Sequence, residues 1–303
     1  MKESLHSYMK VGTVLAMSFP EAAEEGEPFL RALRKVVEDD FFSVVEMAKV
    51  KDPATRRSAL QILALSRLEV GFSGGFALMT GRHNLNAFEE VKRKEAVQVA
   101  VAAYDEGREM GAQFFSLLSG VRPSDRREEA LALLVQSLRE ICAHAEERGN
   151  IPIVLETFDC EIEKRCLIGP SIDALRVANE VGKDYAAFSL MLDLSHLPLL
   201  NEKPAESLRV VKGHIGHIHL GNCVLQDRGH LAYGDSHPPF GISGGENDVD
   251  EVADFFRGLL EVGYLKEGQR PRISLEIRPR PGDDADAILA GSKRVLLDAW
   301  ARV

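Results

Sequence analysis

Short apolar segments alternate with longer amphipathic segments along the whole chain, and this alternation restricts the fold more than any other feature. The apolar segments have the length of buried strands, and the segments between them have the length and the capping residues of helices. Asp52-Pro53, for example, is typical of a helix start, with Asp as the N-cap and Pro in the first turn. The predicted strands are 11–17, 42–47, 68–72, 113–118, 151–156, 188–193, 217–220 and 272–277, and the predicted helices are 28–38, 52–67, 87–110, 124–148, 171–181, 203–212, 248–262 and 284–301.

Eight strands that are each followed by a helix predict an α/β fold of the (β/α)8 type, a TIM barrel. The length of 303 residues is ordinary for one such domain, so we expect a single domain over residues 1–303. The glycine-rich segment 73–86 is expected to be a loop. The alternative fold is an open doubly wound sheet, but no glycine fingerprint of a dinucleotide site follows the first predicted strand.

Composition and charge exclude several classes of protein. The net charge is −10 with acidic residues spread along the chain, which argues against nucleic acid as the main partner because phosphate binding needs a clustered basic face. No apolar run approaches the ~18 residues of a membrane span, and none follows the N-terminus as in a signal peptide. Four cysteines lack zinc-finger spacing and are interpreted as reduced thiols of a cytoplasmic protein: Cys142, Cys160, Cys166 and Cys223. The sequence leaves open whether the chain forms a homo-oligomer.

Four successive predicted strands end in a side chain that can bind a metal ion: Glu156, Asp193, His219 and Glu276. The active sites of TIM barrels lie at the carboxyl ends of the strands, where these four side chains would meet. A single acid at such a position can equally well cap a helix, but four in register predict a site for one divalent ion. A set that is rich in oxygen and has one imidazole suits Mn²⁺, Mg²⁺ or Co²⁺ and also accepts Zn²⁺.

These four residues, with the spacing of Asp193 to His196 and the segment Gly216-His217-Ile218-His219, resemble the xylose isomerase-like TIM barrels. This superfamily contains sugar and sugar-phosphate isomerases and epimerases, together with apurinic endonucleases of the endonuclease-four type. The resemblance covers most of the chain. In the ketose 3-epimerase branch the two glutamates are both metal ligands and the acid/base pair, and the matching histidine helps to hold the substrate. The resemblance therefore implies catalytic roles for Glu156, Glu276 and His196.

The ligands suggest a reaction. A divalent ion that binds two neighbouring oxygens of a hydroxy-ketone polarises the carbonyl and acidifies the adjacent C–H bond. Glu156 and Glu276 could then exchange that proton across an enediolate, which inverts a stereocentre or moves the carbonyl. We therefore predict a metal-dependent sugar or sugar-phosphate isomerase or epimerase with a small carbohydrate substrate. The alternatives are a metal-dependent phosphodiesterase or apurinic endonuclease, and a non-catalytic binding protein on a barrel scaffold.

The loop after the seventh predicted strand, 221–247, has about 27 residues, far longer than most βα connections, and we expect it to lie over the barrel mouth. It contains Asp235-Ser236-His237. In the endonuclease branch a comparable Asp-x-His, joined by the histidine that matches His196, holds a further metal ion. The resemblance thus implies a second site at His196, Asp235 and His237, although the two histidines that endonucleases carry on strands three and four are missing. The other interpretation is a simple turn. Asn222 also departs from the family, where Asp is common.

Five further residues are candidate substrate contacts. Arg278, two positions after Glu276, should face the same mouth, and with Lys164 and Arg228 it could bind a phosphate or carboxylate; the other interpretation is a solvated charge. His217 shares a strand face with His219 and is either a substrate contact or a core histidine. Glu46 could bind a hydroxyl or brace a loop.

Overall fold

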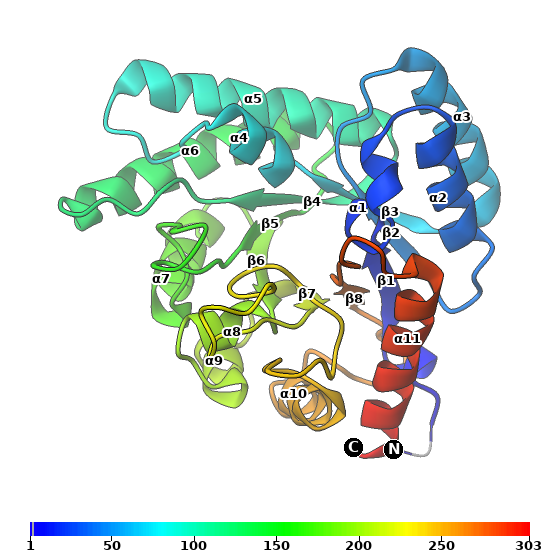
Figure 1. Cartoon of the computed structure of the whole chain (residues 1–303). Coiled ribbons are helices and arrows are strands. Elements are labelled where there is room, and N and C mark those ends of the chain that lie inside the picture. The colour runs from blue at the N-terminus through cyan, green and yellow to red at the C-terminus, as the bar shows by residue number, and fades with distance from the viewer. Residues whose placement is uncertain (2) are drawn as a thin grey trace.

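The eight strands form a closed parallel barrel in the order β1 to β8 (Figure 1), in a computed structural model that describes residue 1 and residues 3–303. β8 returns to pair with β1, with Val11 opposite Ile273. This closure confirms the predicted TIM barrel and excludes the open doubly wound sheet. The strands are β1 Lys10–Val14, β2 Val44–Met47, β3 Glu69–Ser73, β4 Ala112–Leu118, β5 Ile153–Glu156, β6 Phe188–Asp193, β7 Ile215–Leu220 and β8 Arg272–Leu275.

Helices surround the barrel, and α11 lies beside the N-terminal residues, so the two chain ends meet (Figure 1). The amino group of Met1 donates a hydrogen bond of 3.2 Å to the carbonyl of Trp300. The helices are α1 Leu15–Ser18, α2 Glu27–Val37, α3 Pro53–Ser66, α4 Gly75–Gly81, α5 Glu90–Glu109, α6 Arg127–Glu147, α7 Ser171–Gly182, α8 His196–Leu199, α9 Pro204–Val210, α10 Val249–Glu261 and α11 Ala285–Ala301, with short 3₁₀ turns at Leu5–Ser7 and Pro20–Ala23.

The interior of the barrel has an apolar layer beneath a polar one. Four inward-facing side chains from β2, β4, β5 and β6 form a separate apolar cluster: Val44, Phe114, Val154 and Met191. Strand side chains alternate between faces, so the residue two positions further along also points inward, one layer closer to the carboxyl end. In β2, β5 and β6 that residue is an acid: Glu46, Glu156 and Asp193. The packed layer below therefore supports a layer of carboxylates at the mouth.

The structure corrects two predicted segments. The first strand ends at Val14, because residues Leu15–Ser18 form the helix α1. An apolar run alone does not distinguish a buried strand from a buried helical turn, which explains the error. Segment 73–86 is not a continuous loop, since it contains α4. A Cβ atom at Gly74 or Gly75 would approach Phe115 or Leu118 to within 2.2 and 2.7 Å, so these glycines serve close packing.

All four cysteines are buried and form no disulfide, as expected. Within residues 1 and 3–303, no helix combines the length and the apolar character needed to cross a membrane.

Candidate metal centre

The fold brings the four predicted ligands together at the mouth of the barrel. Glu156 and Asp193 end β5 and β6, His219 lies in β7, and Glu276 directly follows β8. Each offers one ligand atom, and these atoms all lie within 4.8 Å of one another. Nδ1 of His219 is 2.6 Å from Oε2 of Glu276 and 3.8 Å from Oε1 of Glu156. Asp193 is opposite His219 in the β6–β7 register, so strand pairing itself sets this part of the geometry.

Two carboxylate oxygens of this cluster fit a bound cation. Oε1 of Glu156 and Oδ2 of Asp193 are buried and have no hydrogen-bond partner among the described residues. The other Asp193 oxygen accepts the backbone N–H of Ser195 at 2.6 Å. A buried carboxylate oxygen without a partner is costly, and a metal ion would remove that cost. The donor set of three carboxylates and one imidazole is compatible with several divalent ions and does not select one.

The four side chains differ in access and charge. Asp193 is fully buried, whereas the side chains of Glu156 and Glu276 remain 11% and 16% exposed, so the two glutamates are the ligands reached from the mouth. Burial, together with the charge of Glu276, raises the pKa of Glu156 to about 8. Burial acts in the same direction on Glu276, but the positive charges of His237 and His219 lower its pKa to about 2. In the ion-free protein one glutamate therefore carries a proton at neutral pH and the other does not.

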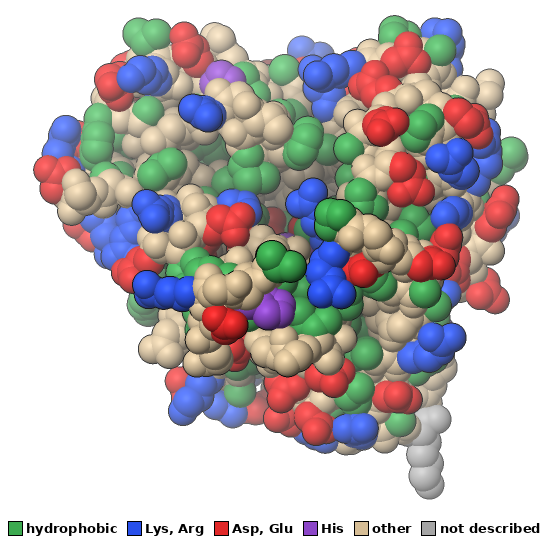
Figure 2. Space-filling model, viewed as in Figure 1, with side chains coloured by type: hydrophobic (Ala, Val, Ile, Leu, Met, Phe, Trp, Pro, Cys, Tyr) green, Lys and Arg blue, Asp and Glu red, His purple; other side chains and the backbone are tan. Residues whose placement is uncertain are grey.

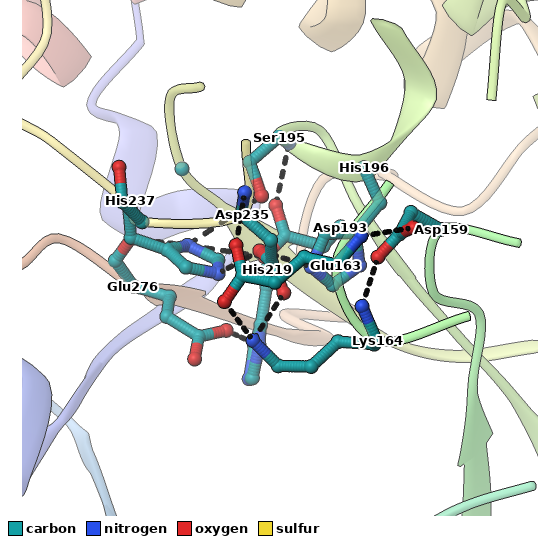
Figure 3. Close-up of polar contacts among 12 residues, drawn as sticks. Asp159, Glu163, Lys164, Asp193, Ser195, His196, His219, Asp235, His237 and Glu276 are labelled. Atoms are coloured by element: carbon teal, nitrogen blue, oxygen red, sulfur yellow. Dashed lines mark hydrogen bonds and ion pairs between the residues drawn. The ribbon is translucent and has the colours of Figure 1, made fainter. Parts of the chain in front are cut away.

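The predicted residues of the second site also lie together (Figure 3). Oδ1 of Asp235 is 3.1 Å from Nε2 of His196 and 2.8 Å from Nε2 of His237. Nδ1 of His196 lies 2.7 Å from the backbone carbonyl oxygen of Thr157, and Nδ1 of His237 lies 3.1 Å from the backbone carbonyl oxygen of Glu276. Metal-binding histidines are commonly oriented by such a bond on the other ring nitrogen. Asp193, His196 and His237 additionally form a group with ligand atoms within 4.8 Å.

Lys164 occupies the other side of Asp235. Its Nζ lies 3.0 Å from Oδ2 of Asp235 (Figure 3). Asp159 organises the loop that carries Lys164, since its buried carboxylate accepts the backbone N–H groups of residues 161–164. Burial would lower the pKa of Lys164, but the charge of Asp235 raises it above its usual range. A second metal ion bound to Asp235 would therefore share its carboxylate with the ammonium group of Lys164.

Two asparagines fix the long loop. Oδ1 of Asn222 accepts the backbone N–H of Asn247 at 2.8 Å, and its Nδ2 donates to the carbonyl of Pro239 at 2.9 Å. Asn247 in turn donates to the carbonyl of Gly221 at 3.0 Å. An aspartate at position 222 has no donor for Pro239, which gives a physical reason for the departure noted in the sequence. His237 lies in the same loop with a left-handed φ of 52°, an uncommon conformation for a non-glycine residue.

The other four predicted substrate contacts fall into two groups. Glu46 and His217 lie inside the barrel beneath His219, and both are buried. Arg278 and Arg228 are exposed. Arg278 lines a cavity of about 470 Å³ between the long loop and the segment after β8.

On the face shown in Figure 2, acidic and basic side chains of the described residues are interspersed and form no continuous basic stripe.

Residues 40–297 match the family described as xylose isomerase-like TIM barrel. The chain belongs to this family. The match confirms the resemblance that the strand-end residues indicated. A comparison with curated protein sequences finds no match.

Several solved structures share the fold at low sequence identity. A D-tagatose 3-epimerase-like protein superposes with a TM-score of 0.72 at 20% identity, covering 97% of this chain and 99% of its own. An AP endonuclease of family 2 from Brucella melitensis gives 0.70 at 17% identity, with 94% and 98% covered. The IolI protein with a bound zinc atom gives 0.72 at 17% identity, with 96% and 98% covered. At these identities the likeness establishes the fold, and the activity has to be argued from the site.

Proposed function

We propose that the protein is a divalent-metal-dependent sugar or sugar-phosphate isomerase or epimerase, with Glu156, Asp193, His219 and Glu276 as the metal ligands. The observation that carries this proposal is the pair of buried, unpartnered oxygens on Glu156 and Asp193, next to the other two ligands. The epimerase and zinc-containing structures that share the fold support the same class.

The two glutamates have complementary roles in this proposal. A divalent ion at the site would polarise the carbonyl of a hydroxy-ketone substrate. Glu156 and Glu276 are the ligands that remain open to the mouth. One glutamate could therefore remove a proton from the carbon beside the carbonyl while the other returns a proton. Acid–base catalysis of this kind contributes roughly 10²–10⁴-fold.

An assay of ketoses and their phosphates tests the proposal. The purified full-length chain is stripped of metal and supplied in turn with Mn²⁺, Mg²⁺, Co²⁺ and Zn²⁺, and sugar products are separated by chromatography. We expect conversion of at least one ketose to an epimer or an aldose, with loss of activity on chelation and recovery on adding the ion. An ion-loaded protein that converts no member of the panel would contradict the proposed function.

The second candidate is a metal-dependent phosphodiesterase that acts on DNA. It is favoured by the orientation of His196 and His237, whose Nε2 atoms both face Asp235. It is opposed by the net charge of −10 and by Lys164 at Asp235. The same preparations are incubated with a duplex containing one abasic site. Cleavage that requires two ions per chain would make this the function, whereas ketose conversion without cleavage would reject it.

A further inference from the structure

Glu46 crosses the interior of the barrel to reach two histidines of β7. Its Oε1 atom lies 2.7 Å from Nε2 of His217, and both of its oxygens lie 3.1 Å from Nε2 of His219. All three side chains are nearly fully buried, at 5%, 0% and 4% exposure for Glu46, His217 and His219. The carboxylate is thus occupied by imidazoles, and a substrate hydroxyl would have to displace one of them.

The fold makes room for this carboxylate in an otherwise apolar place. Gly71 is opposite Glu46 in the β2–β3 register, and a Cβ atom there would lie 2.7 Å from Cγ of Glu46 and 2.3 Å from Phe114. The ring of Phe114 packs against His217 with centroids 4.5 Å apart. Burying an acid here costs free energy, and an apolar residue of similar size would stabilise the barrel at lower cost. A purely structural role is therefore a poor explanation for Glu46.

We propose that Glu46 is a positioning residue for the metal ligand His219; this inference rests on the proposed function. By accepting the Nε2–H of His219, Glu46 fixes the ring orientation and the tautomer. Loss of the Nδ1 proton, which His219 shares with Glu276 in this structure, would then leave the Nδ1 lone pair on the side of Glu156 and Glu276, where the ion would bind. His217 holds Glu46 from the opposite side by donating its own Nε2–H. The chain His217–Glu46–His219 thus connects the packed interior to the metal centre.

The test compares Glu46→Gln with Glu106→Gln in the full-length chain. Glu106 is also buried, at 8% exposure, but its carboxylate binds Arg56 and the backbone N–H of Val50 and, among the described residues, none of the four candidate ligands. Cobalt(II) affinity is measured by competition with a chelating dye, and the visible spectrum of the cobalt protein is recorded. Circular dichroism establishes that each variant is folded. We expect Glu46→Gln to lose about 10–100-fold in affinity and to shift the cobalt absorption, while Glu106→Gln matches the wild type.

The outcomes distinguish a failure of this inference from a failure of the proposed function. Wild-type affinity and an unchanged spectrum in Glu46→Gln would overturn the inference and leave the function standing. An equal loss in both variants would assign the effect to buried charge in general and would also overturn it. A wild-type protein that binds no cobalt would overturn the metal centre and the inference together. If Glu46→Gln does not fold, His217→Phe is used in its place, since this change removes the donor that holds Glu46. Weaker cobalt binding by His217→Phe supports the inference, and unchanged cobalt binding overturns it.

Discussion

Nδ1 of His219 lies 2.6 Å from a carboxylate oxygen of Glu276, where β7 and β8 reach the mouth of the barrel. The two atoms are candidate ligands of one ion, yet in the ion-free protein they share a hydrogen bond. Binding of the ion has to replace this bond and to remove protons from the cluster, because metal ligands must be deprotonated. Metal binding and proton release are therefore linked at this site.

The first prediction is that ion affinity rises with pH. Burial and the charge of Glu276 raise the pKa of Glu156 to about 8, so this ligand carries a proton at neutral pH. Below about pH 8 the loss of this proton should increase the affinity by up to about tenfold per pH unit. Loss of the His219 proton adds to the increase, because Glu46 and Glu276 raise the pKa of this imidazole well above its usual range despite burial. Calorimetric titration in buffers of different ionisation enthalpy measures the affinity and the number of protons released. An affinity independent of pH, with no proton release, would contradict the prediction.

The second prediction is that the ion-free protein becomes less stable as pH rises through the same range. The pKa of Glu156 is 4.5 in the unfolded chain and about 8 in the folded protein, so between these two pH values the side chain carries a proton only in the folded state. The free energy of unfolding therefore falls as pH rises, by up to about 1.4 kcal/mol per pH unit from this group. His237, whose pKa is about 9 despite burial because Glu276 and Asp235 favour its charge, adds a decline above pH 6.5.

Urea unfolding at several pH values, in the presence of a chelator, measures this dependence. Glu156→Gln cannot ionise, so its stability should fall less steeply between about pH 5 and pH 8 than that of the wild type. Glu276 has its effect at lower pH. Its folded-state pKa of about 2 lies below the ordinary 4.5, so its stabilising contribution is complete above pH 4.5 and is lost as the pH falls toward 2. The same slope in the wild type and Glu156→Gln would refute the assignment of the proton to Glu156.

The third prediction concerns Asp193→Ala. This change removes a charged ligand that is fully buried at the centre, so metal binding and turnover should be lost. Asp193 is the last residue of β6, and we expect the barrel still to fold without its side chain. Metal content by atomic emission, ketose conversion and circular dichroism are measured on the same preparation. Asp184→Ala, on the surface after α7, is the control and should behave as the wild type. Full metal content and activity in Asp193→Ala would remove Asp193 from the site.

The fourth prediction is that His237→Ala lowers activity at least tenfold, about 1.4 kcal/mol of transition-state stabilisation. His237 contacts Asp235 and lies 3.8 Å from Asp193, so it reaches the centre either as a substrate contact or as a ligand of a second ion. The metal content separates these roles, since only a ligand role requires a second ion that the variant loses. His230→Ala, in the same loop, is the matched control. Kinetics and metal content both unchanged in His237→Ala would limit the loop to a surface role.

The main features of the fold and of the site could be predicted because they follow from local rules. Strand alternation places Glu156 above Val154 and Asp193 above Met191, and a closed parallel barrel brings all strand ends to one mouth. Lengths and end positions of strands were sufficient for this inference. The error at Leu15–Ser18 arose where an apolar segment continues from a strand into a buried helix.

The connections of the site could not be predicted, because they join residues that meet only in the folded chain. Glu46 and His217 are 171 positions apart in sequence, and nothing local to either residue indicates the other. The contact of Lys164 with Asp235 depends on two separate loops, one of them folded by Asp159. Asn222 could be recognised as unusual, but its role in fixing the loop is apparent only from its partners, Pro239 and Asn247.

The most direct test of the account is solvent hydrogen exchange during turnover. A ketose that the ion-loaded protein converts is incubated with it in deuterated water, and the sugar is analysed by NMR spectroscopy. Proton transfer by Glu156 and Glu276 predicts deuterium at the carbon beside the carbonyl, and loss of this exchange on chelation, in Asp193→Ala and in Glu276→Gln. Turnover without deuterium at any carbon, or exchange that persists without the ion, would contradict it.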